Sequence, residues 1–318
     1  MNKVSDLMES AVSVTQSHAV PFPRRLATMK GIAAMGWVLM SPAMIFLLLF
    51  VFVPIVYVVY LSFYKSNLLS PHPTFVWFQN YVGLFHSAYF MQAFHNSVFL
   101  GAGMLLLSLP MGLVLANLLN MRLKGSHVYR TILFSPYVMP LVGSGLVFTL
   151  LFNTDSGLVN HILTAMGIRA VNWLGSSHYA LVSILILSVW QYAGYYMLIF
   201  LAGLQNVPQP LVEASQVDGA GRWNTFLHVT LPALTPSLFF AMVVSLIQSF
   251  QAFDQVYVMT GGGPDGSSST LTYYIFQKGF QMFQIGPAAA ASVFLLGVLA
   301  VLSLLQVVIS QRWVVEES

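Results

Sequence analysis

Six long apolar runs constrain this chain more than any other feature of its sequence. Because about 20 helical residues cross a hydrocarbon core of about 30 Å, each run is long enough to span a bilayer. Only 7% of the 318 residues are charged, against about 25% expected in a soluble domain, and 57% are hydrophobic. We therefore predict an all-α integral membrane protein with six transmembrane helices, at 37–63, 96–119, 131–152, 179–204, 233–257 and 287–310.

Internal prolines fall inside three of these runs, at Pro54, Pro110 and Pro140. A proline lacks the N–H that the helix needs and its ring meets the carbonyl four residues back. Neighbouring helices can satisfy the freed carbonyl groups within a bundle. We therefore predict kinks at these positions.

The twelve basic residues predict the orientation. With the N-terminus in the cytoplasm, nine of them lie inside, namely Lys3, Arg24, Arg25, Lys30, Arg122, Lys124, Arg130, Arg222 and Arg312, and three outside, namely Lys65, Arg169 and Lys278. This excess on one side favours cytoplasmic termini. Tails at 1–36 and 313–318 would then flank a membrane domain at 37–312. Arg24-Arg25 does not indicate an export signal, because the following apolar run is too long.

Several function classes are excluded or disfavoured. The chain has no cysteine, and none of its eight histidines pairs at helical i, i+4 spacing, so we predict no metal site and no bound cofactor. No two of its nine acidic residues share an apolar run, which argues against an enzyme. The net charge of +3 is too small to indicate nucleic-acid binding. The glycines of 260–264 lack the Gly-Lys-Ser/Thr of a phosphate loop, and we interpret them as a flexible turn.

Polar side chains within two of the apolar runs allow two interpretations. Gln248, Gln251, Asp254 and Gln255 would share one side of a continuous fifth helix, and Gln191, Tyr192, Tyr195 and Tyr196 lie together in the fourth run. Amides, hydroxyls and rings suit a hydroxylated solute. The same groups also join helices within bundles. If they line a translocation pathway, its candidate residues are Gln191, Tyr195, Gln248, Gln251 and Asp254.

The polar interruption that follows the fourth run covers 212–232 and is predicted to face the cytoplasm. We predict two short helices, with Asp218 as the N-cap of the second and Gly219 and Gly221 loosening the backbone between them. Leu231-Pro232 closes the unit. On the other side, the loop 64–94 carries enough aromatic surface to predict a packed segment that meets a partner, and 153–178 contains a turn at Gly157 and a short amphipathic helix.

The spacing in this polar interruption carries a family resemblance. Glu213-Ala214-Ser215, three residues, Gly219, nine residues and Val229-Thr230-Leu231-Pro232 resemble the EAA loop of membrane subunits in binding-protein-dependent ABC importers. The series Leu133–Pro136–Pro140, the pair Gly157–Asn160 and the segment 253–264 are similar to patterns of the carbohydrate-uptake permeases of the maltose and glycerol-3-phosphate kind. Phe148 stands where many relatives carry tryptophan. The resemblance covers about 37–312.

The resemblance implies a type I importer permease in a prokaryotic cytoplasmic membrane. Its partners would be membrane lipid, a second homologous permease, an extracytoplasmic solute-binding protein and two ATPase subunits that hold ATP and Mg. The solute would be a sugar or a related polyol or glycerol phosphate. The segment 213–226 would be the coupling helix, with contact residues Glu213, Ala214, Ser215, Asp218, Gly219, Ala220, Arg222, Phe226, Leu231 and Pro232. The alternatives are a stand-alone secondary transporter or channel, or a non-transporting scaffold.

Overall fold

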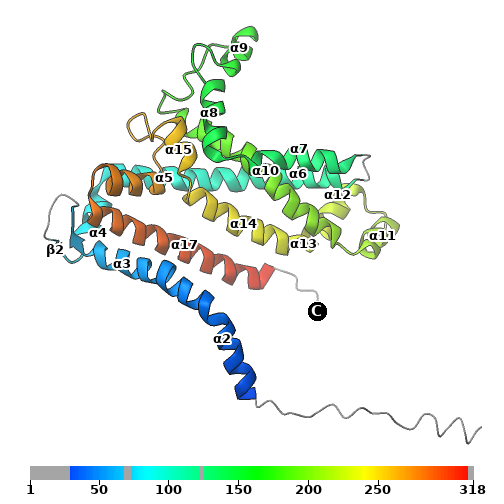
Figure 1. Cartoon of the computed structure of the whole chain (residues 1–318). Helices are drawn as coiled ribbons and strands as arrows, with labels where there is room; N and C mark the ends of the chain where they lie inside the picture. The colour runs from blue at the N-terminus through cyan, green and yellow to red at the C-terminus, as the bar shows by residue number, and fades with distance from the viewer. Residues whose placement is uncertain (1–28, 68–72, 122–124, 314–318) are drawn as a thin grey trace, which may run out of the picture. The chain divides into compact units, whose positions relative to one another are not determined.

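The structure is a computed structural model that describes residues 29–67, 73–121 and 125–313 (Figure 1). The predicted positions Lys3, Arg24, Arg25, Arg122 and Lys124 and most of the two predicted tails lie outside these residues. The described elements are α2 (Met29–Leu47), η1 (Leu48–Phe52), α3 (Val53–Ser62), β1 (Tyr64–Lys65), β2 (Thr74–Phe75), α4 (Gln79–His86), α5 (Ala88–Gly103), η2 (Met104–Ser108), α6 (Leu109–Asn120), α7 (Ser126–Val138), α8 (Leu141–Leu151), α9 (Leu158–Ala165), α10 (Ala180–Gln205), α11 (Gln209–Val217), α12 (Arg222–Thr225), η3 (Phe226–Thr230), α13 (Leu231–Ala233), α14 (Thr235–Phe250), α15 (Asp254–Met259), α16 (Leu271–Phe276), η4 (Gln277–Gln281) and α17 (Ile285–Trp313).

The chain divides into two compact units, the first ending at Val56 and the second beginning at Tyr57. In the described part of the first unit, α2 and η1 leave large apolar side chains exposed along their length, such as Leu39 and Phe50. A helix that is apolar on all sides and exposed is suited to lipid contact. The helix begins at Met29, inside the predicted N-terminal tail.

Within the described residues, four helices are long and apolar enough to cross a membrane, and up to six spans result if each of two bent pairs counts as one. The four are Met35–Ser62, Ala88–Asn120, Ala180–Gln205 and Ile285–Ser310. They confirm four of the predicted runs, with the second starting at Ala88 rather than at residue 96. The residues 88–94, predicted as loop, are therefore helical.

The other two predicted spans are not straight helices. The third is bent by 94° between α7 and α8, at the predicted proline Pro140. The fifth is bent by 68° where α13 meets α14. The predicted span 233–257 is also too long, because α14 ends at Phe250 and α15 is a separate short helix.

Three of the wide π turns precede a proline. The π segments η1, η2 and η3 end two residues before Pro54, Pro110 and Pro232, respectively. In each case the carbonyl four residues before the proline lies within the π segment, so the wider turn accommodates the ring at the point where the α-helical hydrogen bond is missing. Pro54 and Pro110 thus introduce π turns within spanning helices that otherwise continue.

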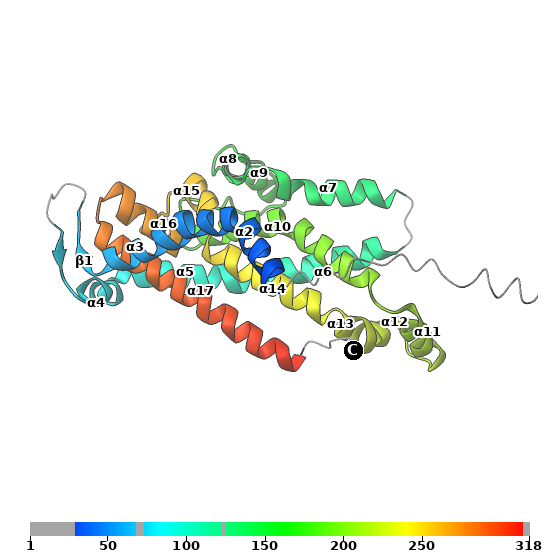
Figure 2. The same ribbon diagram turned by 60° about the horizontal axis from the view of Figure 1, so that its bottom comes forward.

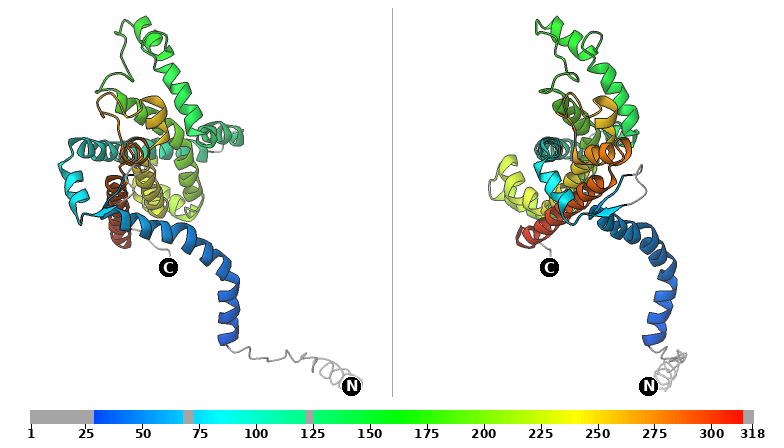
Figure 3. Two further views of the ribbon diagram at one scale, coloured as in Figure 1. Left: turned by 60° about the vertical axis from the view of Figure 1, so that its left-hand side comes forward. Right: turned by 90° about the vertical axis from the view of Figure 1, so that its left-hand side faces the viewer.

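The core of the second unit lies around α10. This helix packs against α6, α7 and α14 and buries Ile184, Leu187, Tyr196 and Phe200 completely. Figure 2 shows α10 behind α14, with α17 running along the outside of the layer. Figure 3 shows α8 and α9 (green) projecting away from this layer. Helix α8 packs mainly against α15, with smaller contacts to α10 and α9.

The glycine-rich loop, residues 260–270, is a packed structure rather than the flexible turn that we predicted. Ser268, Ser269 and Thr270 are fully buried. The Asn96 amide of α5 donates to the Gly266 carbonyl at 3.1 Å and to the Ser269 carbonyl at 2.8 Å. The loop is therefore fastened to a helix that lies far away in the sequence.

The predicted turn at Gly157 and the short helix after it are confirmed by α9. Asn160, only 2% exposed, organises this loop. Its amide donates to the carbonyls of Thr154 and Val171 at 3.0 and 2.9 Å, and its oxygen accepts from the Trp173 indole at 3.1 Å. The Asn160 side chain thus joins the segment before α9 to the segment after it.

Candidate functional site

The polar insert, residues 209–233, contains the two short helices that the sequence predicts. The first, α11, begins after Pro208 and ends in a Schellman motif. The Gly219 N–H donates to the Gln216 carbonyl at 3.1 Å and the Ala220 N–H to the Ser215 carbonyl at 2.9 Å. Gly219 has φ +83°, the left-handed conformation that this motif needs and that glycine adopts without strain.

Asp218 does not have the predicted role of N-cap. It is the C-cap of α11, and the N-cap of α12 is Gly221. The prediction was wrong because Gly219 and Ala220 form the Schellman turn that ends α11, so the second helix starts only after Gly221. Asp218 is left exposed at the end of α11.

A hydroxyl pair closes the two helices of the polar insert onto each other. The Ser215 and Thr225 hydroxyl groups lie 3.0 Å apart, and Thr225 is buried. Ser215 also donates to the Val212 carbonyl at 2.8 Å, which leaves the Thr225 hydroxyl as donor to Ser215. The insert therefore has an internal hydrogen bond in addition to its helix cap.

The outer surface of the polar insert is apolar at two prominent points. Val217 is 88% exposed and Trp223 is 69% exposed. The Trp223 ring stacks on that of Phe226, with centroids 5.9 Å apart, which limits its motion. Large aromatic side chains held in this way are typical anchors of protein interfaces.

The base of the polar insert is held by a close helix contact. Leu234, at the bend before α14, is fully buried. A Cβ atom on Gly203 of α10 would lie close against the Ser237 hydroxyl group and 2.7 Å from the Leu234 side chain, so a larger residue at this position would have to displace these side chains. The chain enters the insert from α10 and leaves it into α14, and these two helices therefore meet at its base.

The polar side chains predicted on one face of the fifth helix are divided between three segments. Gln248 is on α14, Gln251 is the C-cap of that helix, and Asp254 and Gln255 belong to α15. The helix stops because the Thr272 hydroxyl donates to the Phe250 carbonyl at 2.9 Å and the Thr270 hydroxyl to the Ala252 carbonyl at 2.6 Å. The four residues therefore do not form a single stripe.

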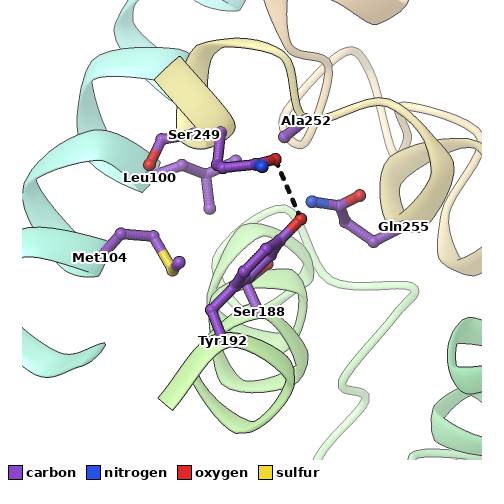
Figure 4. A pocket seen from close by; sticks show the side chains of 8 residues that line it. Leu100, Met104, Ser188, Tyr192, Ser249, Ala252 and Gln255 are labelled. Atoms are coloured by element: carbon purple, nitrogen blue, oxygen red, sulfur yellow. Dashed lines mark hydrogen bonds between the residues drawn. The ribbon is translucent and has the colours of Figure 1, made fainter. Parts of the chain in front are cut away.

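Gln248 takes part in a helix–helix contact. The Tyr192 hydroxyl group of α10 donates a hydrogen bond to the Gln248 side-chain oxygen at 3.2 Å, which is the dashed line in Figure 4. Leu100 and Met104 flank the small cavity at this point and Tyr192 points into it. The cavity measures about 10 Å³, about enough for one water molecule and far too small for a sugar. In this conformation Gln248 and Tyr192 connect helices.

Gln191 and Tyr195 differ in their surroundings. Gln191 is 2% exposed and donates to the Met139 carbonyl at 3.0 Å, beside the bend between α7 and α8. Its side-chain oxygen is buried and has no hydrogen-bond partner among the described residues. Tyr195 is half-buried and stacks on Tyr137 of α7 with centroids 4.5 Å apart. The helix α10, which carries both residues, packs against α15, which carries Asp254.

Gln251 and Asp254 lie beside a group of aromatic rings that the sequence did not reveal. Gln251 is exposed and Asp254 half-buried. The ring of Phe253 lies 5.5 Å from that of Tyr257 and 5.0 Å from that of Phe276 in α16. Tyr273 stacks on Phe253, and burial raises the pKa of its hydroxyl group.

Two kinds of residue were missed by sequence reasoning. Trp223 stands between the residues of the EAA resemblance and could have been selected as an exposed aromatic residue within a polar segment. Phe276 contacts Phe253 and Tyr257 but is distant from both in sequence, and no local signal connects them. Within 29–67, 73–121 and 125–313, no three His, Asp or Glu side chains are placed to hold a metal ion.

Known proteins match most of the chain. Residues 108–315 match the family described as "Binding-protein-dependent transport system inner membrane component". The chain is 35% identical to the probable ABC transporter permease protein YurN of Bacillus subtilis over 85% of its own length and 94% of that protein. It is 36% identical to the sulfoquinovosyl glycerol transport system permease protein SmoG of Agrobacterium fabrum, over 80% and 83% of the two chains. It is 33% identical to the sn-glycerol-3-phosphate transport system permease protein UgpA of Yersinia enterocolitica, over 76% and 83%.

The fold is similar to that of a chain in the crystal structure of a bacterial alginate ABC transporter in complex with a pentasaccharide-bound periplasmic protein. The TM-score is 0.78 at 23% identity, over 91% of this chain and 98% of that one. This likeness confirms the predicted six-helix type I permease fold. The family match over 208 residues and the identities above 30% confirm the predicted resemblance. The chain therefore belongs to the family of inner-membrane components of binding-protein-dependent transport systems, and it is a transport permease rather than an enzyme.

Proposed function

We propose that this chain is one half of the membrane channel of an ATP-driven importer, paired with a second homologous permease. Two ATPase subunits that hold ATP and Mg would bind on the cytoplasmic side, and a solute-binding protein on the other. The distribution of lysine and arginine supports cytoplasmic termini in a prokaryotic inner membrane. The membrane domain would be 37–312, with tails on either side.

The observation that carries the proposal is the geometry of the polar insert. Its two helices are joined by the Schellman turn at Gly219 and by the Ser215–Thr225 hydrogen bond, so the insert can move as one piece. Trp223 and Val217 project from it. We propose that Trp223 is the anchor that enters a groove of an ATPase subunit. The predicted contact residues would surround that anchor or support it from within the insert.

The same geometry gives the insert a connection to the membrane spans. Movement of the insert by an ATPase subunit would be transmitted at its base, where Leu234 packs on Gly203. Because α10 and α14 meet there, both helices would move with it. Rigid-body motion of this kind is one of the common ways in which a local event changes the state of a whole protein.

For the solute we propose a carbohydrate or a glycerol phosphate compound. The relatives named above are described as transporting sulfoquinovosyl glycerol and sn-glycerol-3-phosphate, and another, from Thermococcus litoralis, trehalose and maltose. An aromatic group next to a carboxylate and an amide suits a hydroxylated ring. We propose Gln251, Asp254 and Tyr195 as contacts on the pathway, with Gln191 and Gln248 shaping it through the helices that they hold.

A pair of glycine substitutions in the polar insert tests the coupling role. Gly219→Val forces a β-branched residue to φ +83°, whereas Gly221→Val occupies φ −68°, which valine adopts freely. Neither added Cβ would have a neighbour within 4 Å. We expect Gly219→Val to insert and assemble but to lose solute-stimulated ATPase activity in the reconstituted complex, and Gly221→Val to retain it.

Equal stimulation in both variants would contradict a coupling role for the polar insert. The alternative of a stand-alone transporter has its own test, because such a chain would transport in liposomes without any ATPase subunit.

Uptake kinetics in the same reconstituted complex test the pathway. Asp254→Asn and Gln251→Leu should raise the solute concentration needed for half-maximal transport, and unchanged kinetics in both would limit these residues to a packing role.

A further inference from the structure

A row of aromatic rings connects the end of the first span with the loop that follows it. Tyr57 and Tyr60 of α3 have ring centroids 6.2 Å apart, and Tyr60 lies 4.5 Å from Tyr64 of β1. The row continues across the hairpin to Phe75 at 5.2 Å and from there to Trp77 at 4.9 Å. We call these five residues the aromatic row. The aromatic row therefore begins on a spanning helix and continues into the loop without a gap.

The aromatic row is exposed along most of its length. Tyr57 and Tyr60 are 58% and 50% exposed on the surface of a span, which lipid or another membrane subunit must cover. Phe75 and Trp77 are similarly exposed, at 49% and 67%. The surface of the loop is thus continuous with the membrane-facing surface of the helix.

Helix α4 extends this surface next to Trp77. Residues Val76, Trp77, Phe78, Val82 and Gly83 line a shallow groove together with Gln79 and His86. The opposite face of α4 is fixed to the end of the first span, because the Tyr81 hydroxyl lies 2.7 Å from that of Ser62 and the Asn80 amide donates to the Ser62 carbonyl at 2.7 Å. The helix therefore lies at the level where the first span ends.

The same level marks the start of the last span. Gly286, in the first turn of α17, lies directly against the Tyr64 carbonyl, and α4 packs along α17. Figure 1 shows α4 and β2 at the end of the molecule opposite to α11. Two spans thus place the groove at a boundary between hydrocarbon and water.

The charge distribution favours lipid over protein at this surface. The sequence has no Asp, Glu, Lys or Arg from residue 66 to 121, and the nearest charge, Lys65 on β1, is exposed. Tryptophan and tyrosine concentrate at membrane interfaces, where their rings meet the headgroup region. Protein–protein interfaces usually add a charged rim. Here the polar residues that line the groove are Gln79 and His86, and among the described residues of 57–67 and 73–86 Lys65 is the only Lys, Arg, Asp or Glu.

We propose that the aromatic row and the outer face of α4 form an interfacial anchor, seated in the headgroup layer of the leaflet opposite to the polar insert. The anchor would hold the ends of the first and last spans at a fixed depth. Interfacial helices bury their apolar face about 5–10 Å into the boundary region. Lys65 would meet the lipid phosphate groups at its edge. This proposal does not depend on the coupling role of the polar insert.

Single cysteines test the proposal cleanly, because the chain has none of its own. Phe75→Cys and Val82→Cys, each labelled with an environment-sensitive fluorophore, would report on the anchor. Thr74→Cys is the matched control, since adjacent strand residues point to opposite faces. The full chain, assembled with its partner subunits, would be placed in nanodiscs of phosphatidylethanolamine and phosphatidylglycerol that contain lipid brominated near the headgroup.

We expect labels at residues 75 and 82 to lose most of their emission to brominated lipid, and the label at residue 74 to be quenched instead by aqueous iodide. Iodide quenching at all three positions would overturn the proposal. So would an emission change at residues 75 and 82 only when the solute-binding protein is added, because that result would make the surface a protein docking site.

A measurement on the native side chain guards against a disturbed variant. Trp77→Phe keeps the aromatic surface and removes one of the six tryptophans. The difference in emission between the two chains is the contribution of Trp77, and brominated lipid should suppress that difference. A Trp77 contribution that survives brominated lipid would also overturn the proposal.

Discussion

The polar insert and the glycine-rich loop both use a glycine with positive φ, but they are held together in different ways. Gly219 has φ +83° and Gly266 has φ +76°. In the polar insert, the hydrogen bonds that fix the turn connect residues within ten positions of each other. In the glycine-rich loop, Asn96 reaches across 170 residues to the Gly266 carbonyl. One element is built locally and the other is built by the tertiary structure.

Their surroundings follow the same division. A Cβ on Gly219 would meet nothing within 4 Å, whereas a Cβ on Gly266 would overlap the Tyr89 ring. An exposed element with local bonds can be moved by a partner without breaking the core. A buried loop that joins α5 to the end of α14 must stay fixed. Gly219 therefore belongs to an exposed element that is suited to contact with a partner, whereas Gly266 belongs to a buried loop that holds two helices together.

The largest effect that would test this division is Gly266→Ala. Alanine at positive φ costs about 1–2 kcal/mol, and forcing an extra atom against a packed ring adds about 1–3 kcal/mol. Gly219→Ala has the first cost only. We expect thermal unfolding of the purified full-length chain to show a loss of about 3 kcal/mol for Gly266→Ala and about 1 kcal/mol for Gly219→Ala. Equal losses would show that crowding at Tyr89 does not distinguish the two sites.

A smaller effect should follow from Asn96→Ala. This change removes the side-chain donor of the buried Ser269 carbonyl, at a cost of about 1–3 kcal/mol, and one of the two donors to the Gly266 carbonyl, which keeps the Ser269 N–H at 3.0 Å. We expect protease cleavage within 260–270 to become faster and the unfolding temperature to fall. Asn224→Ala, on the exposed face of α12, is the matched control and should leave both unchanged. A loop that stays protected in Asn96→Ala would mean that its backbone is held by other contacts.

The sequence was a good guide where structure depends on neighbouring residues. The apolar runs located the spans, Pro140 located the sharp bend, and the spacing around Gly219 located the polar insert. These features follow from bilayer thickness, from the missing proline N–H and from the conformational freedom of glycine. Each of these features depends only on residues that lie close together in the sequence.

The sequence failed where a distant segment decides the local structure. The end of α14 at Phe250 could not be predicted, because hydroxyl groups of Thr270 and Thr272 satisfy the carbonyls there. The same break moves Asp254 from a helix stripe to α15, whose Tyr257 contacts Phe276. By hydropathy alone, the apolar run continues through Tyr257, and the pattern does not indicate that the helix ends at Phe250.

The smallest effect concerns the hydroxyl pair inside the polar insert. The EAA pattern has alanine where this chain has Ser215, so the bond between Ser215 and Thr225 is an addition to the family pattern. A hydrogen bond of this kind contributes about 0.5–1.5 kcal/mol net. Ser215→Ala should therefore lower global stability little, and it should reduce solute-stimulated ATPase activity in the complex less than Gly219→Val does.

A double-mutant cycle with Thr225→Val isolates the contribution of this pair. If the bond makes the two helices move together, each single variant should reduce stimulation to a similar degree, and the double variant should be no worse than either. Additive losses would show that the two side chains act separately, Thr225 through its burial and Ser215 through its bond to the Val212 carbonyl. In that case the Schellman turn at Gly219 would alone keep the polar insert in one piece, and the local element would be simpler than its hydrogen bonds indicate.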